Sequence, residues 1–365
     1  MMVTIEQIQN AKQLTRDAKV KVFSHNDLDG VGCGIVAKLA FKDADVTYCG
    51  YDNINQEVAD FINGEDYLFF DQIFITDISV NKDVEELINE TPELVWKIKL
   101  LDHHATAKHL NENDWAFVSP IGRYGKNSGT NMLYDYLKMA GFFTRDLYRD
   151  ALEVFVEKVR RYDSWEWKEV YNDIEALNLN NLFFLYGLKW FESKYLSRIA
   201  NISTCIIKNG TWIDLFNQAD KVVLDVDYEK KIAYINRKEK QMITGAMIRG
   251  KTVGFVFAEQ YISELGNELC ERHPELDFVA IIDLGSKRVS YRTVKDDIDL
   301  GKDIASHFGG GGHPKASGSQ IDINIVKMVF PMIFGSEKLK KQQVSLITGK
   351  GFIGKLGKFI DKLTK

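Results

Sequence analysis

The sequence predicts an α/β protein with an N-terminal, doubly wound, mainly parallel sheet and a smaller α/β domain with a mixed sheet, and a cleft between the two. In the first half of the chain, short apolar runs that end in polar residues alternate with helix-like segments. This alternation is typical of the β–α repeats that build a parallel sheet. A shorter alternation of strand and helix patterns follows toward the C-terminal end. The sequence therefore predicts two domains, each with a sheet of a different kind.

The expected elements follow from these runs in order. Strands in the first domain are expected over 20–25, 45–51, 72–79 and 96–104. Helices are expected over 30–42, 83–90, 130–140 and 147–163, followed by a mostly helical stretch to about residue 248. In the second domain, strands are expected over 252–258, 278–284 and 288–293, with a helix over 261–273. Doubly wound sheets bind ligands at the carboxyl ends of their strands, which is where the acids and histidines of this sequence stand.

We therefore expect four parts along the chain: a first domain over 1–190, a helical connector over 191–248, a second domain over 249–330 and a basic tail over 331–365. The formal net charge of the 365 residues is −5, although the segment 336–365 has eight lysines against Glu337 and Asp361. The rest of the chain is thus clearly acidic, which disfavours binding of long nucleic acid through many phosphates. A small substrate held by metals and a few basic groups is compatible with this charge.

We expect a cytoplasmic protein with no membrane span. The first residues show no basic segment followed by an apolar core, and no apolar run approaches the ~18 residues of a membrane-spanning helix. The cysteines are scattered without CxxC spacing and are expected to be reduced thiols; they are Cys33, Cys49, Cys205 and Cys270.

Residues 24–30, SHNDLDG, place His25, Asp27 and Asp29 at alternate positions, beginning at the end of the first expected strand. If the strand continues through them, all three side chains point to one face. Two carboxylates and an imidazole at one place are costly unless a cation lies there. The alternative is a polar loop that caps the following helix, with Asp29 as its N-cap. Taken alone, this segment leaves both interpretations open.

Two more expected strands end in acids or histidines. Asp77 follows an apolar run and either faces the same edge of the sheet or caps the next helix. Asp102, His103 and His104 follow another run, and adjacent histidines point in different directions. One can then bind a metal while the other faces a substrate, and Asp102 can orient an imidazole. For the two histidines, a satisfied surface pair is the alternative.

Asp163 ends the expected helix 147–163, where its charge opposes the helix dipole. A metal would relieve this unfavourable interaction, and so would a salt bridge to Arg160 or Arg161.

In the second domain, the segment HFGGGGHPKASG over 307–318 contains four successive glycines. Glycines let the backbone approach a ligand and expose its N–H groups, although a flexible turn is the alternative. No Gly-Lys-Ser/Thr follows, so it is not a Walker A loop.

Taken in order, HxDxDG, a strand-end Asp, DHH, a further Asp and GGGGHPKASG resemble the motifs of the DHH superfamily of phosphoesterases that have a DHHA1 substrate domain. The resemblance covers roughly residues 20–322. Within the superfamily, the overall pattern is most similar to the oligoribonucleases, or nanoRNases, of the NrnB type. The basic tail lies outside this resemblance.

The resemblance implies two divalent metal ions, Mn²⁺ with Mg²⁺ as the alternative, and carboxylates with imidazoles suit both. It implies His25 and Asp27 as ligands of one metal, Asp29, His103 and Asp163 as ligands of the other, and Asp77 as the bridge. His104 looks like the histidine that meets the scissile phosphate, and Asp102 like its partner. His25 stands two residues before the first aspartate, whereas many relatives have it four before.

In the second domain, the resemblance implies substrate contacts from Arg292, Gly310, Gly311, Gly312, His313 and Lys315. The expected activity is exonucleolytic hydrolysis of short single-stranded RNA, about 2–5 nucleotides long, to nucleoside 5′-monophosphates. Three alternatives stay open: a 3′-phosphoadenosine 5′-phosphate phosphatase, a cyclic-dinucleotide phosphodiesterase, and a catalytically dead nucleotide- or RNA-binding module. Whether the chain forms a homodimer also stays open.

Overall fold

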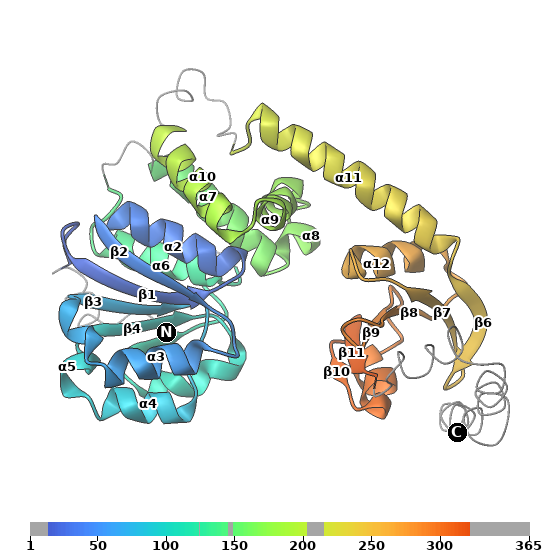
Figure 1. Cartoon of the computed structure of the whole chain (residues 1–365), viewed down its shortest axis with the longest axis horizontal. Coiled ribbons are helices and arrows are strands. Elements are labelled where there is room, and N and C mark those ends of the chain that lie inside the picture. The colour runs from blue at the N-terminus through green and yellow to red at the C-terminus, as the bar shows by residue number, and fades with distance from the viewer. Residues whose placement is uncertain (1–13, 124, 145–148, 203–214, 322–365) are drawn as a thin grey trace, which may run out of the picture. The chain divides into compact units, whose positions relative to one another are not determined.

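The computed structural model describes residues 14–123, 125–144, 149–202 and 215–321. The chain forms two compact units, Met1–Leu224 and Asp225–Lys365, with their boundary inside helix α11, Gln218–Glu239 (Figure 1). The finer division into four parts, and a cleft, stay predictions. The basic tail over 331–365 lies outside the described residues.

The first unit is built on a sheet of five strands in the order β2-β1-β3-β4-β5. All four neighbouring pairs are parallel, which confirms the predicted doubly wound sheet. The strands are β1 (Lys19–His25), β2 (Asp43–Cys49), β3 (Gln72–Thr76), β4 (Ile98–Asp102) and β5 (Ala116–Val118). The strand order reverses beside β1, so the carboxyl ends of β1 and β3 lie next to each other at the position where such sheets bind ligands.

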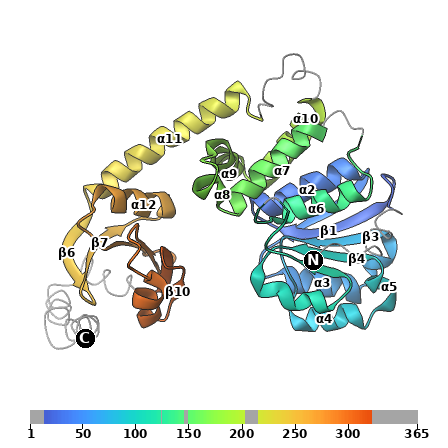
Figure 2. The same cartoon turned by 180° about the vertical axis from the view of Figure 1, so that it is seen from behind.

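Helices cover both faces of this sheet, as Figures 1 and 2 show from opposite sides. On one face lie α2 (Leu28–Ala40) and α6 (Gly129–Met139), with α7 (Arg149–Asp163), α9 (Ile174–Tyr186) and α10 (Leu188–Ile202) beyond them. On the other face lie α3 (Ile54–Asn63), α4 (Lys82–Asn89) and α5 (Pro92–Val95). Shorter helical segments are Asp66–Phe69, Ala105–Glu112 and α8 (Glu166–Glu169).

The hydrophobic core of this unit has two parts, one on each face of the sheet. Val20 and Val22 of β1 belong to the cluster under α2 and α6, whereas Phe23 belongs to the cluster under α3 and α4. This alternation follows from the two-residue period of a strand. Burial on both faces explains why β1 and its neighbours are almost continuously apolar until their carboxyl ends.

Close packing of α2 against α6 requires a small residue at Gly32. A Cβ atom at this position would lie 2.2 Å from Oγ1 of Thr130. The same Oγ1 donates a hydrogen bond to the carbonyl of Asp29 at 2.6 Å. The contact between these helices therefore also fixes the start of α2.

The second unit contains a six-stranded sheet in the order β10-β11-β9-β8-β7-β6. Only β7 and β8 pair in parallel among these described strands, so the predicted mixed sheet is confirmed. The strands are β6 (Ile243–Ile248), β7 (Lys251–Phe257), β8 (Phe278–Asp283), β9 (Arg288–Arg292), β10 (Gly311–Gly312) and β11 (Ala316–Gln320). Helix α12 (Ile262–Arg272) and the short helical segments Leu300–Ile304 and Ala305–Phe308 complete the unit.

The prediction of a mostly helical stretch to residue 248 was wrong at its end, because Ile243–Ile248 forms the edge strand β6. Among the described strands it pairs only with β7, and it is largely exposed, so it lacks the apolar pattern of a buried strand. Among the described helices, none is both long and apolar enough to cross a membrane.

Replacing Gly32 with Ala should lower the melting temperature, although Ala favours an isolated helix by about 1 kcal/mol over Gly. The new methyl group would clash with Thr130, and overpacking of this kind costs about 1–3 kcal/mol. Thermal unfolding followed by circular dichroism measures the change. A variant that melts at or above the wild-type temperature would contradict the close packing of α2 on α6.

Candidate active site

The predicted functional residues of the first unit come together at the carboxyl edge of its sheet. His25 is the last residue of β1, and Asp102 is the last residue of β4. Asp77 directly follows β3, and Asp163 is the last residue of α7. The β1 strand does not continue through the SHNDLDG segment, as one interpretation assumed. Instead, Asp27 is the N-cap of α2, and its side chain accepts the backbone N–H of Gly30 at 3.0 Å.

His25, Asp27 and Asp77 form the first group. Nδ1 of His25 lies 2.8 Å from Oδ2 of Asp27 and 3.8 Å from Oδ2 of Asp77. Burial acts to raise the pKa of Asp27, but the hydrogen bond and charge of His25, together with the backbone N–H of Gly30, lower it below its ordinary value. One ligand atom from each of the three residues lies within 4.8 Å of the others.

Asp29, His103 and Asp163 form the second group. Nε2 of His103 lies 3.3 Å from Oδ2 of Asp163 and 3.8 Å from Oδ2 of Asp29. Burial lowers the pKa of His103, which keeps its imidazole neutral and able to bind a metal. The three ligand atoms again lie within 4.8 Å of one another.

Asp29 is held by the start of α6. Its two carboxylate oxygens accept the backbone N–H groups of Gly129 at 2.5 Å and Thr130 at 2.9 Å. These are the unpaired donors at a helix N-terminus, where the helix dipole stabilises a negative charge. The bonds fix the direction of the carboxylate toward the cluster.

Asp77 is a member of the first group and also contacts His103 of the second. It is 1% exposed, it has a φ of 60°, and its Oδ1 lies 3.1 Å from Nε2 of His103. Burial, and then the charges of Asp29 and Asp27, raise the pKa of Asp77 well above its ordinary value. The same causes raise the pKa of Asp163. These two acids are therefore strongly destabilised as anions when no cation is near.

The end of α7 is clamped by a buried ion pair. Nη1 of Arg160 donates to the carbonyl of Lys126 at 2.9 Å and to Glu166 at 2.6 Å, and Glu166 accepts the backbone N–H of Lys126 at 3.0 Å. Arg160 is 3% exposed. Both arginines before Asp163 bond to other acids, namely Glu157, Glu166 and Asp173. The clamp therefore positions Asp163 without neutralising it.

Comparisons with known proteins identify the family of this chain. A family model described as the DHH family, N-terminal domain, matches residues 19–156. The oligoribonuclease NrnB of Bacillus subtilis is 43% identical over 310 residues, which cover 84% of this chain and 74% of that protein. This chain belongs to the DHH family. A 3′,5′-cyclic-nucleotide phosphodiesterase of Helicobacter pylori is 24% identical, over 82% of this chain and 92% of that protein.

Two solved structures show the DHH fold at low sequence identity. One is the exonuclease RecJ bound to manganese, with a TM-score of 0.51, 11% identity, and coverage of 94% of this chain and 95% of that chain. The other is the DHH domain of a member of a family of ribosomal proteins, with a TM-score of 0.52, 13% identity, and coverage of 93% of this chain and 90% of that chain. These likenesses concern the fold alone.

The edge of this DHH sheet fits divalent cations. Among the described residues, Oδ2 of Asp77 and Oδ2 of Asp163 are buried without a hydrogen-bond partner. Buried carboxylate oxygens are normally paired, so two unpaired ones in one cluster favour the binding of a cation. Carboxylate oxygens and imidazole nitrogens are ligands that Mg²⁺, Mn²⁺ and similar metals accept.

Asp102 and His104, the outer members of the DHH run, form a pair of their own. Oδ1 of Asp102 accepts from Nδ1 of His104 at 2.7 Å and from the backbone N–H of His103 at 2.8 Å, while Oδ2 accepts from Ser79 at 2.5 Å. The hydrogen bond to Asp102 raises the pKa of His104. The bond to Nδ1 orients the imidazole of His104. Asp102 and His104 also have ligand atoms that lie within 4.8 Å of those of Asp77 and His103.

Tyr51 is a residue of this edge that the sequence analysis missed. It lies two residues after β2, its ring centroid is 4.9 Å from that of His25, and its hydroxyl is 3.4 Å from Nε2 of His104. Partial burial, and then the charges of Asp77 and Asp102, raise the pKa of Tyr51 to about 12. No motif includes it, and its place after a strand end was the only signal available.

The glycine run of the second unit lines a hollow of that unit. Arg288 and Arg292 of β9, Gly309–Gly312 and residues 316–320 contribute to it. Arg292 is held by hydrogen bonds from its guanidinium to the carbonyl of Tyr291 at 2.9 Å and to Ser263 at 3.0 Å. His313 and Lys315 do not line the hollow, and Lys315 pairs with Asp296.

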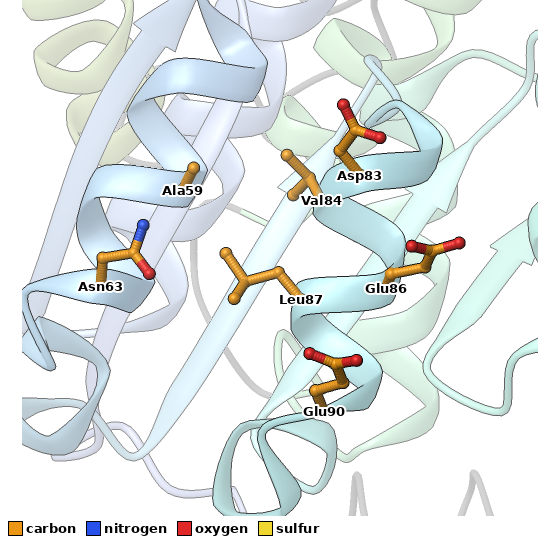
Figure 3. Close-up of a pocket in the computed structure, with 7 residues that line it drawn as sticks. All are labelled: Ala59, Asn63, Asp83, Val84, Glu86, Leu87 and Glu90. Carbon is orange, nitrogen blue, oxygen red and sulfur yellow. The ribbon is translucent and has the colours of Figure 1, made fainter.

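Another hollow, between α3 and α4, is unsuited to an anionic substrate (Figure 3). Its lining residues are Ala59, Asn63, Asp83, Val84, Glu86, Leu87 and Glu90. Three of these described side chains are carboxylates and none is basic, so the local potential repels phosphate.

Replacing Asp77 with Asn should raise the melting temperature of the metal-free protein near neutral pH by about 2–4 °C, or ~1 kcal/mol. The pKa of Asp77 is higher in the folded state than in the unfolded state. Between the two pKa values the folded state binds more protons, so wild-type stability falls as pH rises through this window. Thermal unfolding in the presence of a chelator, from about pH 4 to about pH 8, should show a smaller fall in melting temperature for the variant than for the wild type.

The same variant should also lose most of the stabilisation that added Mn²⁺ gives the wild type. An Asp77→Asn protein that is less stable than the wild type at every pH, or equally stabilised by Mn²⁺, would remove Asp77 from the centre of a cation site.

Proposed function

We propose that this chain is a two-metal phosphodiesterase that degrades short single-stranded RNA from one end and releases nucleoside 5′-monophosphates. The observation that carries this proposal is the cluster of carboxylates and imidazoles around Asp77, which contains two groups of three residues that could each hold a metal ion. The 43% identity to an oligoribonuclease over most of both chains supports the substrate class.

We assign His25 and Asp27 to one metal and Asp29, His103 and Asp163 to the other, with Asp77 between them. The support is that the ligand atoms of His25, Asp27 and Asp77, and those of the second three residues, each lie within 4.8 Å of one another. Mn²⁺ is the proposed metal, with Mg²⁺ as the alternative, because two of the side chains are imidazoles. When bound, such a pair lowers the pKa of water and stabilises charge on the phosphoryl oxygens.

The remaining residues of this edge position the substrate. His104 has Nδ1 bonded to Asp102, so its Nε2 is the nitrogen available to donate to a phosphoryl oxygen. Asp102 fixes the ring in this orientation and favours its charged form. Ser79 and the backbone of His103 hold Asp102 in turn.

The glycine-lined hollow of the second unit is proposed to bind the end of the RNA. Arg292 supplies a planar donor for a phosphate, and Gly310, Gly311 and Gly312 are proposed to let the ligand approach the backbone closely. His313 and Lys315, which follow the glycines but do not line the hollow, are proposed as further contacts. The hydrogen bonds that hold Arg292 support a fixed, preorganised contact.

We also propose that the protein acts in the cytoplasm. Three described cysteines, Cys33, Cys49 and Cys270, are buried free thiols, which suits a reducing compartment. The proposed partner is short RNA of about 2–5 nucleotides, because an acidic chain has little means to hold many phosphates.

The test is hydrolysis by purified protein with Mn²⁺ of a substrate panel. The panel contains RNA dimers to pentamers, a long RNA, 3′-phosphoadenosine 5′-phosphate, 3′,5′-cyclic nucleotides and cyclic dinucleotides. The proposal predicts nucleoside 5′-monophosphates from the short RNAs at rates at least about tenfold above those of the other substrates, a difference of ~1.4 kcal/mol. A chelator should abolish the reaction.

An Asp163→Asn protein prepared in the same way controls for contaminating ribonucleases, since it should be inactive on every substrate. If the bisphosphonucleotide or a cyclic nucleotide is hydrolysed faster than all the short RNAs, the proposed substrate class is wrong while the metal chemistry stands.

A further inference from the structure

Tyr51 stands at the carboxyl edge of the sheet, between the two histidines that end β1 and follow β4. Its ring centroid lies 4.9 Å from that of His25 and 6.4 Å from that of His104. The planes are tilted by 50° in the first pair and 86° in the second. Two ring contacts from different strands therefore hold the orientation of the tyrosine ring.

The hydroxyl group adds a third contact. It lies 3.4 Å from Nε2 of His104, whose Nδ1 is bonded to Asp102. A bound phosphoryl group would approach the same Nε2, so the tyrosine ring lies beside the place where the scissile phosphate is proposed to bind. The distance of 3.4 Å is long for a hydrogen bond of this kind, so this contact alone does not explain a large ring at this place.

Most of the Tyr51 side chain is exposed despite these contacts. It is 63% exposed, whereas Asp77 and Asp102 beside it are each 1% exposed. An aromatic ring that is oriented by its neighbours but open to solvent is the kind of surface on which single-stranded nucleic acids stack their bases. Stacking also tolerates any base, because every base has a π-face.

Building on the proposed function, we propose that Tyr51 is a substrate-contacting residue whose exposed ring stacks on the nucleobase next to the scissile phosphate. Neutral stacking suits this edge, because the carboxylates that surround the site give it little attraction for further phosphates. It provides binding to the base of any short RNA without reading its sequence.

The test compares three substrates in two variants of Tyr51. The substrates are an RNA dinucleotide and the two matched dinucleotides in which one or the other nucleotide is abasic. Tyr51→Leu removes the ring and should raise KM for the intact dinucleotide about tenfold, the equivalent of ~1.4 kcal/mol. For the abasic substrate that lacks the stacked base, the KM of Tyr51→Leu should stay within about twofold of the KM of the wild type. Tyr51→Phe, which keeps the ring, should raise KM less than Tyr51→Leu does.

Trp96→Leu is the matched control. Trp96 is an aromatic residue of the same unit, 77% exposed, that precedes β4 at the opposite edge of the sheet. Its replacement should leave the kinetics with all three substrates unchanged.

Equal effects of Tyr51→Leu on the intact and both abasic substrates would overturn the inference and leave Tyr51 as a support for His104. So would a fall in kcat with an unchanged KM, or a larger defect in Tyr51→Phe than in Tyr51→Leu. A wild-type protein that cleaves no RNA dinucleotide would instead overturn the proposed function, and this inference with it.

Discussion

The central interaction in the first unit is the repulsion among carboxylates at the carboxyl ends of its strands. Other contacts of this unit reduce that repulsion. Asp27, Asp29, Asp77 and Asp163 converge there with two imidazoles. Backbone N–H groups at the start of α6 stabilise Asp29, and His25 stabilises Asp27. Asp77 and Asp163 keep a buried oxygen without a partner among the described residues. The remaining charge is what a pair of cations would neutralise.

The fold makes this convergence possible because β1 and β3 are neighbours whose carboxyl ends meet where the strand order reverses. The backbone adapts to it locally. Asp77 takes a left-handed conformation with a φ of 60°, which aspartate tolerates better than most residues. Helix α6 starts so close to Asp77 that a Cβ atom at Gly129 would lie 2.4 Å from Cβ of Asp77. Only glycine lets the N–H groups of α6 reach Asp29 at this place.

The sheets and most of the edge could be predicted from the sequence, because buried strands are apolar and the acids and histidines follow them directly. The conformation of the chain at Asp27 could not be predicted, because the same residue types occur at strand ends and at helix caps. The clamp formed by Lys126, Arg160 and Glu166 joins positions far apart in the sequence and belongs to no motif. Tyr51 carries no sequence signal beyond its place after β2, and β6 is an exposed edge strand without a buried pattern.

The most direct test of a cluster built around two cations is a crystal structure grown with Mn²⁺ and measured at the manganese absorption edge. The account predicts two anomalous peaks on either side of Asp77, one bound by His25 and Asp27 and the other by Asp29, His103 and Asp163. A single peak, two peaks that do not share Asp77, or manganese bound only elsewhere on the surface would contradict it.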